Sequence, residues 1–507
     1  MKKTLLTIAC IISFISYQFA QDANGVILSD TGNITIIKVW GTHQQRGFAV
    51  GYLLADKIKN LYEGYIKPQF GSNLSVAKQT IQQGIHISVD EIYKQETQGM
   101  IEGITAAGVT MAAGTDYLDI LVANSFLDLQ GLGGSFTNMT FGTGCSSFMS
   151  WGDATMSSDL QGKSVISRHL DWEVNSVLNA NQVIIIHYPS EANEQPWFLI
   201  GFAGQLSVLS GINNSGVCAF QHMMSGSGLG SGLYNKAYEP IWFSTRKALE
   251  TNDYNGDGIN NTQDIKAVLA ENINGYADGY IVSSLAPSTQ VVDSLVAMVA
   301  EVNPVAPYLS FRSNEYNDSI PGDNLYAANS PIKRNNARAY CSRYYNMINR
   351  IKNYYNDGDS IGTFANWEIM RLASNAGSGN IQFMQYIPEN REFSLSVYKN
   401  ATPAYLNNKM TFDLDDFFTA PVSIASINNK SEVQIYPNPA KDKVIITCTE
   451  NIAQLSIYDV TGKLITQKTD ITQKQCTFAP TNVKQGFYFY KITTQSGFVY
   501  NGKIIFQ

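Results

Sequence analysis

The first part of the chain places apolar side chains at helical spacing. A strand-like run at residues 30–41 comes first. Helices are then predicted over 41–66, 88–108 and 116–130, where apolar residues recur with the period of one helix face. We therefore expect residues 21–144 to form a mainly helical segment.

After residue 145 the pattern changes to short apolar runs that are typical of strands. These runs lie at residues 165–168, 183–188, 197–202 and 216–221, with two further strands within 380–399. Helices are expected over residues 240–300, with one interruption, and over 338–356. Alternating sheet and helix blocks predict a layered α/β or α+β domain over residues 145–420.

The last part of the chain has an all-β pattern. Residues 421–432 are mostly small and polar, which is typical of a linker. From Val433 onward, short alternating runs are separated by turn signals such as Gln485-Gly486. We expect a small β-sandwich over residues 433–507. The length of 507 residues agrees with two or three domains.

Composition and charge narrow the functional classes. A hydrophobic content of 44% is enough to bury a large core. The net charge of −7 argues against a nucleic-acid partner, because such proteins carry a basic surface.

The N-terminus has the pattern of an export signal. Met1-Lys2-Lys3 and the apolar run at 5–15 predict a signal peptide over residues 1–20, with a cut near Ala20. The run is too short to span a bilayer, and a lipoprotein cysteine at Cys10 is the alternative. We expect a secreted or cell-surface protein.

The strongest chemical signal surrounds Cys145. The sequence G-T-G-C-S-S-F at 142–148 places a thiol after glycine and before small hydroxyl residues, with Arg168 and Asp171 downstream. Five cysteines follow the signal peptide, and an odd number in an oxidising compartment leaves one unpaired. This pattern predicts self-cleavage between Gly144 and Cys145, which would give Cys145 a free α-amine. A thiol pKa of about 8.5 and an amine pKa of about 8 allow that amine to take the thiol proton near neutral pH.

A second signal is a loop of the EF-hand type at residues 253–264. Oxygen ligands recur at the spacing that calcium requires, and Gly258 permits the sharp turn. The predicted ligands are Asp253, Asn255, Asp257, the carbonyl of Ile259, Asn261 and Asp264. A structural calcium ion is expected here, a polar surface turn is the alternative, and no cofactor is expected for catalysis.

The C-terminal segment resembles a known secretion module. Y-P-N-P at 436–439, I-Y-D-V-T-G-K at 457–463 and G-F-Y-F-Y-K at 486–491 are similar to the sorting domain of the bacterial type IX secretion system. The resemblance implies transport by that machinery, followed by release or surface attachment. A carbohydrate-binding or adhesion sandwich is the alternative.

Residues 30–418 resemble the N-terminal-nucleophile (Ntn) amidases related to penicillin acyltransferase, acid ceramidase and choloylglycine hydrolase. The match is closest to the group that includes isopenicillin-N acyltransferase. The matching segments, in chain order, are R-G-F-A-V-G at 46–51, E-G-I-T-A-A-G at 102–108, L-V-A-N at 121–124, G-C-S-S at 144–147, R-H-L-D-W at 168–172, G-I-N-N-S-G-V at 211–217, A-N-S-P at 328–331 and, more loosely, S-R-Y at 342–344. The resemblance implies a four-layer αββα Ntn-hydrolase core.

The resemblance also implies roles for individual residues. Cys145 is the nucleophile and Arg168 its neighbour, while Asp171 contacts the α-amine or the substrate. Asn329 donates to the oxyanion, and Arg343 anchors this network. His169 stands where the family usually has Asn. Related hydrolases often have a second oxyanion Asn, and here Gln221, His222 or backbone N–H groups are the candidates.

The predicted function is cleavage or transfer at a linear N-acyl amide bond through a thioester. Residues 21–144 are expected to stay bound as the small chain, and a small N-acyl or lipid-like molecule is the expected substrate. Trp40 and Trp172 are candidates for an acyl pocket or for core packing. A lipid amidase, a phospholipase-B-like hydrolase and a non-catalytic surface binding protein with a degenerate Ntn fold remain alternatives.

Overall fold

The computed structural model describes most of the chain. The described residues are 23–132, 144–225, 230–288, 296–313, 320–335, 341–373, 377, 379–421, 433–459, 463–479, 485–495 and 499–506. The chain divides into two compact units, residues 1–420 and 421–507. The predicted signal peptide and nearly all of the predicted linker lie outside the described residues.

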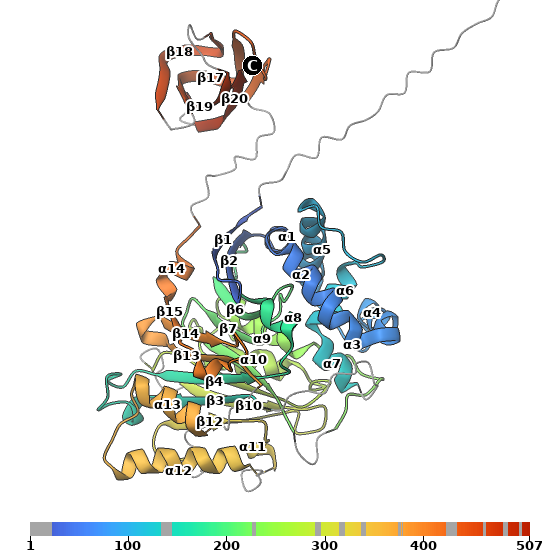
Figure 1. Ribbon diagram of the computed structural model, residues 1–507, viewed down its shortest axis with the longest axis vertical. Helices are drawn as coiled ribbons and strands as arrows, with labels where there is room; N and C mark the ends of the chain where they lie inside the picture. The colour runs from blue at the N-terminus through green and yellow to red at the C-terminus, as the bar shows by residue number, and fades with distance from the viewer. Residues whose placement is uncertain are drawn as a thin grey trace, which may run out of the picture. The chain divides into compact units, whose positions relative to one another are not determined.

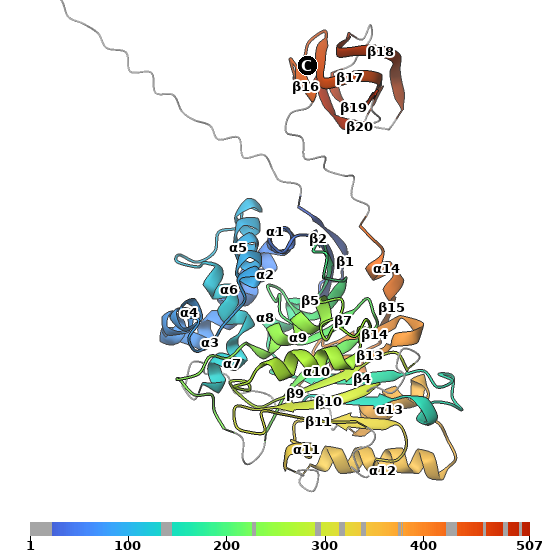
Figure 2. The same cartoon turned by 180° about the vertical axis from the view of Figure 1, so that it is seen from behind.

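Two sheets form the centre of the first unit (Figures 1 and 2). The nine-stranded sheet has the order β1 (Gly25–Asp30), β2 (Ile34–Gly41), β5 (Gln182–Pro189), β6 (Trp197–Phe202), β7 (Ser210–Asn213), β8 (Cys218–Met223), β9 (Tyr280–Leu285), β10 (Ala297–Val302) and β11 (Leu309–Arg312). The six-stranded sheet has the order β12 (Asn324–Ala327), β3 (Ser146–Ser150), β4 (Val165–Asp171), β13 (Asn380–Ile387), β14 (Glu392–Val397) and β15 (Met410–Asp413).

Helices cover the outer faces of both sheets. Those before Cys145 are α1 (His43–Leu53), α2 (Ala55–Leu61), the π-helix η1 (Tyr62–Ile66), α3 (Lys67–Phe70), α4 (Leu74–Gln83), α5 (Glu91–Ala106), α6 (Tyr117–Asn124) and α7 (Phe126–Gly131). Those after it are α8 (Ser176–Ala180), α9 (Ile241–Glu250), α10 (Thr262–Glu271), α11 (Ile332–Asn335), α12 (Ser342–Asn356) and α13 (Thr363–Ala373). The short helix α14 (Leu414–Phe418) instead packs its apolar side chains on the residues between the sheets.

Three apolar clusters show that these elements form four layers. One cluster lies between the sheets and joins residues such as Ile184 and Phe198 to Met384 and Phe393. A second packs the helices before Cys145, together with α9 and α10, on the nine-stranded sheet. A third packs α12 and α13 on the six-stranded sheet. This is the predicted αββα arrangement.

The prediction of helix across residues 240–300 is wrong in its second half. Helices α9 and α10 are present, but residues 280–285 and 297–302 are the paired strands β9 and β10. Every residue of both strands is buried, since helices cover one face and the second sheet covers the other. Strands buried on both faces lose the alternation that distinguishes them from helices in a sequence.

Glycines allow α1 and α5 to pack in backbone contact. A Cβ added to Gly47 would overlap the carbonyl of Glu96, and one added to Gly51 would overlap that of Met100. A Cβ added to Gly99 or Gly103 of α5 would likewise overlap a backbone carbonyl of α1. The glycines of the R-G-F-A-V-G segment therefore serve this helix crossing.

The crossing brings together a group of charged side chains that we call the ionic cluster. Its members are His43, Arg46, Glu96, Glu191, Glu194, Arg246 and Glu250. His43 contacts Glu96 through Nδ1 at 2.7 Å and Glu194 through Nε2 at 2.8 Å. Arg246, which is fully buried, reaches Glu96 at 2.6 Å. The ionic cluster joins residues that precede Cys145 to residues that follow it.

The second unit is a curled five-stranded sheet. Its strands are β16 (Val433–Tyr436), β17 (Val444–Tyr458), β18 (Leu464–Phe478), β19 (Gly486–Thr494) and β20 (Val499–Phe506). The long strand β17 pairs with β16, β18 and β19, so the sheet encloses its own apolar core. Among the helices of the described chain, none has the length and hydropathy needed to cross a membrane.

The ionic cluster predicts a pH-dependent stability. Burial favours neutral His43, but its hydrogen bonds with Glu194 and Glu96 outweigh this and raise the pKa of His43 to about 9. A raised folded-state pKa gives a contribution that is complete below about pH 6.5 and is lost as the pH rises through about 9. We expect wild type to lose roughly 3 kcal/mol of unfolding free energy from this group over that interval, and His43→Gln to lack this loss.

Denaturant unfolding at pH 6 and pH 9.5 measures the difference. His86→Gln is the matched control, because His86 packs on Tyr234 outside the ionic cluster. If His43→Gln and wild type lose the same free energy between the two pH values, His43 is not held protonated by the cluster.

Candidate active site

Strand pairing places Cys145 beside the end of β4. Cys145 immediately precedes β3, and β3 pairs antiparallel with β4 so that Ser146 lies opposite His169 and Ser147 opposite Arg168. The side chain of Asp171 comes so close to Gly144 that a Cβ there would overlap its carboxylate. Cys145 is 5% exposed.

Arg168 brings a buried positive charge to this site. Its Nη2 donates to the carbonyl of Gln221 on β8 at 2.7 Å, which links the two sheets. Its Nε and Nη1 have no hydrogen-bond partner among the described residues. Burial lowers the pKa of Arg168, while Cys145 and Asp171 oppose that shift. The guanidinium therefore keeps donor capacity for a negative charge at this place.

Asp171 titrates close to the physiological range. Burial raises its pKa to about 6, against the effects of a 2.7 Å hydrogen bond from Asn380 and of Arg343 and Arg168. Its carboxyl is therefore ionised at neutral pH and becomes neutral in moderately acidic solution.

Arg343 and Asn329 complete the group. Arg343 lies in the first turn of α12, and its Nη1 donates to the carbonyl of Cys145 at 3.1 Å and to Ser146 Oγ at 3.2 Å. Its Nη2 donates to Asn329 Oδ1 at 2.6 Å, and Asn329 Nδ2 donates to the carbonyl of Met223 at 2.6 Å. The structure thus brings together all five residues that the sequence motifs selected, including the loosely matched Arg343.

The thiol of Cys145 is not activated in the continuous chain. Burial raises its pKa, while the charges of Arg168 and Arg343 act in the opposite direction. Cys145 and the cysteines at 218, 341, 448 and 476 are free thiols. A nearby proton acceptor would have to remove the proton of Cys145 before it could attack.

Gln221 and His222 point to opposite faces of β8. Gln221 Oε1 accepts from Trp242 Nε1 at 2.9 Å, and its Nε2 has only a long contact of 4.0 Å to Met223 Sδ. His222 Nε2 lies 2.9 Å from Ser147 Oγ between the sheets, and burial holds its pKa well below the usual range. Among the described residues, His222 Nδ1 has no hydrogen-bond partner, so both side chains keep donor capacity.

His169, which lies between Arg168 and the site residue Asp171 in the sequence, faces away from this site. Successive residues of a strand face opposite sides of the sheet, and His169 packs edge-on against Phe383 with ring centroids 4.2 Å apart. Burial and Arg168 lower its pKa to about 3, so its ring is neutral.

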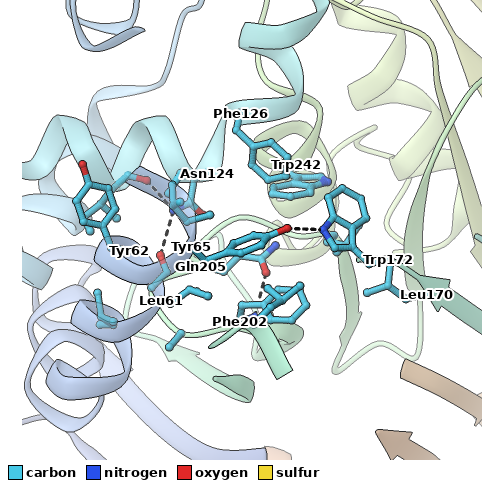
Figure 3. A pocket seen from close by; sticks show the side chains of 18 residues that line it. Leu61, Tyr62, Tyr65, Asn124, Phe126, Leu170, Trp172, Phe202, Gln205 and Trp242 are labelled. Carbon is cyan, nitrogen blue, oxygen red and sulfur yellow. Dashed lines mark hydrogen bonds between the residues drawn. The ribbon is translucent and has the colours of Figure 1, made fainter. Parts of the chain in front are cut away.

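The structure also contains an apolar pocket, and Figure 3 shows the side chains that line it. It has an empty volume of about 660 Å³, part of it open to solvent. Its wall consists of Ile58, Leu61, Tyr62, Tyr65, Ile66, Ile120, Ala123, Asn124, Phe126, Leu170, Trp172, Leu178, Phe202, Ala203, Gly204, Gln205, Leu209 and Trp242. Leu170 and Trp172 flank Asp171, and Trp242 contacts Gln221, so the pocket and the charged site share a border although Cys145 is not part of the wall.

Segments before and after Cys145 build the pocket together. Figure 3 shows the rings of Phe126, Trp172 and Trp242 close to one another. The centroid of the Phe126 ring lies 6.2 Å from that of Trp172 and 5.2 Å from that of Trp242. Tyr65 accepts a 3.0 Å hydrogen bond from Trp172 Nε1. Trp172 therefore lines the pocket, whereas Trp40 is absent from its wall.

The predicted calcium loop is an ordered turn before α10. Asp253 Oδ1 accepts from the N–H of Gly256 at 2.8 Å, and Asp253 Oδ2 accepts from that of Gly258 at 2.8 Å. Asn255 Oδ1 and Asp257 Oδ1 also accept loop N–H groups. These oxygens keep further lone pairs, so the backbone pattern is compatible with a bound cation.

Two of the predicted ligands also cap a helix. Asn261 is the N-cap of α10, and its side chain accepts from the N–H of Gln263 at 2.7 Å. Asp264 accepts three backbone N–H groups, two of them at Oδ1. Burial raises the pKa of Asp264, and the nearby Asp253 adds to that shift.

Comparison with known proteins identifies the C-terminal segment. Residues 434–507 match the family described as "Secretion system C-terminal sorting domain". No curated protein matches the chain.

Solved structures with a similar arrangement are distant. The N-acylethanolamine-hydrolyzing acid amidase ortholog of Caenorhabditis elegans is 11% identical and has a TM-score of 0.36, over 53% of this chain and 100% of that one. A mutant conjugated bile acid hydrolase from Clostridium perfringens is 12% identical with a TM-score of 0.33, over 53% and 93%. Penicillin V acylase from Agrobacterium tumefaciens is 11% identical with a TM-score of 0.33, over 53% and 86%.

The charges at the site predict the reactivity of the thiol. Arg343 lowers the pKa of Cys145, so Arg343→Met should slow alkylation of Cys145 by iodoacetamide at pH 8 roughly threefold to tenfold. Mass spectrometry of the Cys145 peptide measures the rate. Arg350→Met, on the exposed face of the same helix, is the control. Equal rates in both variants and wild type would contradict the assigned role of Arg343.

Proposed function

We propose that this chain is a self-cleaving amidohydrolase or acyltransferase whose nucleophile is Cys145. The observation that carries the proposal is the convergence of three charged side chains, Arg168, Asp171 and Arg343, on Cys145 and the two residues that flank it. Arg343 bonds the Cys145 carbonyl and orients Asn329, while Asp171 lies against Gly144 and Arg168 brings a buried charge. The four-layer arrangement is the one expected for an Ntn amidase.

Self-cleavage would create the catalytic group. Cys145 gives up its thiol proton and its sulfur attacks the carbonyl carbon of Gly144. The S–C bond of a thioester forms as the peptide C–N bond breaks, and the released nitrogen takes up that proton as the α-amine. Water then hydrolyses the thioester, which frees the thiol and leaves a carboxylate on Gly144. The amine now lies beside the thiol and can accept its proton without a histidine.

The same groups would then act on a substrate amide. The thiolate attacks the acyl carbon, and the α-ammonium protonates the leaving nitrogen. Asn329 Nδ2 carries a second hydrogen besides the one given to Met223, and this hydrogen can stabilise the oxyanion. Gln221 Nε2 and His222 Nδ1 are the candidates for the second donor. Ionised Asp171 holds the amine in place. Water completes a hydrolysis, whereas an amine completes an acyl transfer.

The pocket favours an apolar acyl group. Its wall is almost entirely aliphatic and aromatic, and such surfaces bind acyl chains through burial of apolar area. This favours the lipid amidase among the alternatives. A phospholipase-B-like hydrolase would use the same thiol on an ester.

The segment before the cut would remain as a permanent small chain. It supplies His43, Arg46 and Glu96 to the ionic cluster and half of the pocket wall. Loss of this segment would leave buried charges unpaired and open the pocket, both at a large cost in free energy.

The sorting domain supports export by the type IX secretion machinery. The match over residues 434–507 is the basis for this step. We expect the mature enzyme to be secreted or attached to the cell surface, with removal of residues 1–20 on the way.

Hydrolysis of a graded substrate series tests the proposed reaction. Wild type should cleave N-acyl 4-nitroanilides with rates that rise from acetyl to palmitoyl, because longer chains bury more apolar area. Cys145→Ala should be inactive. Trp172→Ala should lose the preference for long chains, whereas the control Trp40→Ala should keep it, since Trp40 lies outside the pocket wall.

Other outcomes separate the alternatives. Cleavage of the matching esters without cleavage of the amides would support the phospholipase-B-like hydrolase. Binding of long-chain amides without turnover by either wild type or Cys145→Ala would support the non-catalytic binding protein.

We also propose that the loop at 253–264 binds a structural calcium ion. The oxygens of Asp253, Asn255 and Asp257 and the carbonyl of Ile259 would hold it, with Asn261 and Asp264 closing the loop. Burial, and to a lesser extent the nearby Asp253, raise the pKa of Asp264, and a divalent cation would offset both effects by stabilising the carboxylate.

Calcium should therefore raise the melting temperature of wild type by several degrees, as expected for a ligand that binds only the folded state. Asp253→Asn should reduce that rise, and Asp56→Asn, an exposed acid on α2, should not. An unchanged melting temperature of wild type at millimolar calcium would eliminate the calcium site.

A further inference from the structure

The end of β4 is held by a residue that none of the sequence motifs contains. Asn380, the first residue of β13, is fully buried, and its Nδ2 donates to Asp171 Oδ1 at 2.7 Å. We propose that Asn380 is a positioning residue that fixes the orientation and the ionised state of Asp171. This inference rests on the proposed function.

A β-bulge aims the Asn380 side chain at Asp171. Asn380 pairs with Asp171 and Gln382 pairs with Leu170, so one extra residue of β13 is accommodated between them. Directly opposed residues of an antiparallel pair project to the same face, which brings the amide to the carboxylate. Bulges of this kind commonly re-aim a side chain next to a functional site.

The Asn380 amide has no freedom to rotate. Its Oδ1 accepts the N–H of Tyr405 at 2.9 Å, and its Nδ2 also donates to the carbonyl of Gln382 at 3.2 Å. The oxygen and nitrogen of the amide are therefore fixed by backbone groups, and Nδ2 can only present a donor to Asp171. A donor held in this way favours the carboxylate over the carboxylic acid.

The same segment also fixes the border of the pocket. The N–H of Trp172 donates to the carbonyl of Gly379 at 2.8 Å. Residues 379–380 thus hold Asp171 through its side chain and Trp172 through its backbone. A shift of this segment would therefore displace two residues together: Asp171, whose carboxylate would hold the α-amine, and Trp172, which lines the acyl pocket.

Two variants separate positioning from folding. Asn380→Ala removes the donor. Asn380→Asp keeps the shape and the acceptor for Tyr405 but places a second carboxylate against Asp171. Gln382→Ala is the matched control, because Gln382 is equally buried on β13 and its side chain bonds to Gln182 instead.

The measurement is the pH profile of kcat/KM for an N-acyl 4-nitroanilide, together with the melting temperature. On the acidic side of the profile, kcat/KM should fall at a pH that is roughly one unit higher in Asn380→Ala than in wild type, and higher still in Asn380→Asp. The reason is that each change raises the pKa of Asp171. The effect should appear in kcat more than in KM. Gln382→Ala should lower the melting temperature without changing the pH at which kcat/KM falls on the acidic side.

The outcomes distinguish this inference from the proposed function. If wild type is active and the profiles of both Asn380 variants overlay its own after scaling, Asn380 has only a structural role. If wild type neither separates into two chains nor cleaves the probe, the proposed function fails and the role of Asn380 falls with it.

Discussion

The antiparallel pairing of β3 with β4 is the constraint on which the candidate site depends. It places Ser146 opposite His169, so the residue before β3 lies beside the residue that ends β4. Cys145 and Gly144 thereby lie next to Asp171. A shift of one residue in this register would turn Arg168 from the inter-sheet space to the helix-covered face and would abolish the site.

Burial decides the electrostatics of the site. Arg168 is fully buried, and among the described residues the only hydrogen bond of its guanidinium is to a neutral carbonyl of the other sheet. A buried cation of this kind is costly, and a negative charge on the sulfur or on an acyl oxygen would offset that cost. The same burial opposes ionisation of Asp171, which Asn380, Arg343 and Arg168 make possible near neutral pH. In the proposed reaction, the site would hold the one negative charge that develops on the sulfur or the acyl oxygen.

The sequence motifs located five catalytic candidates because short segments carry them, and the structure brings those five together. Other features were beyond sequence reasoning. The bond between Asn380 and Asp171 depends on a bulge in a strand pair whose members are far apart in the chain. The ionic cluster depends on the glycine contacts between α1 and α5. The sequence pattern predicts helix where β9 and β10 lie, because both faces of these strands are buried and the alternation of apolar and polar residues is lost.

The central claim is that Cys145 frees its own α-amine. Denatured mass spectra of purified wild type, Cys145→Ala and the control Cys218→Ala, a buried thiol outside the site, test it most directly. The account predicts two chains divided between Gly144 and Cys145 in wild type and in Cys218→Ala, and one uncut chain in Cys145→Ala. A single uncut wild-type chain, or an identical cut in Cys145→Ala, would contradict it.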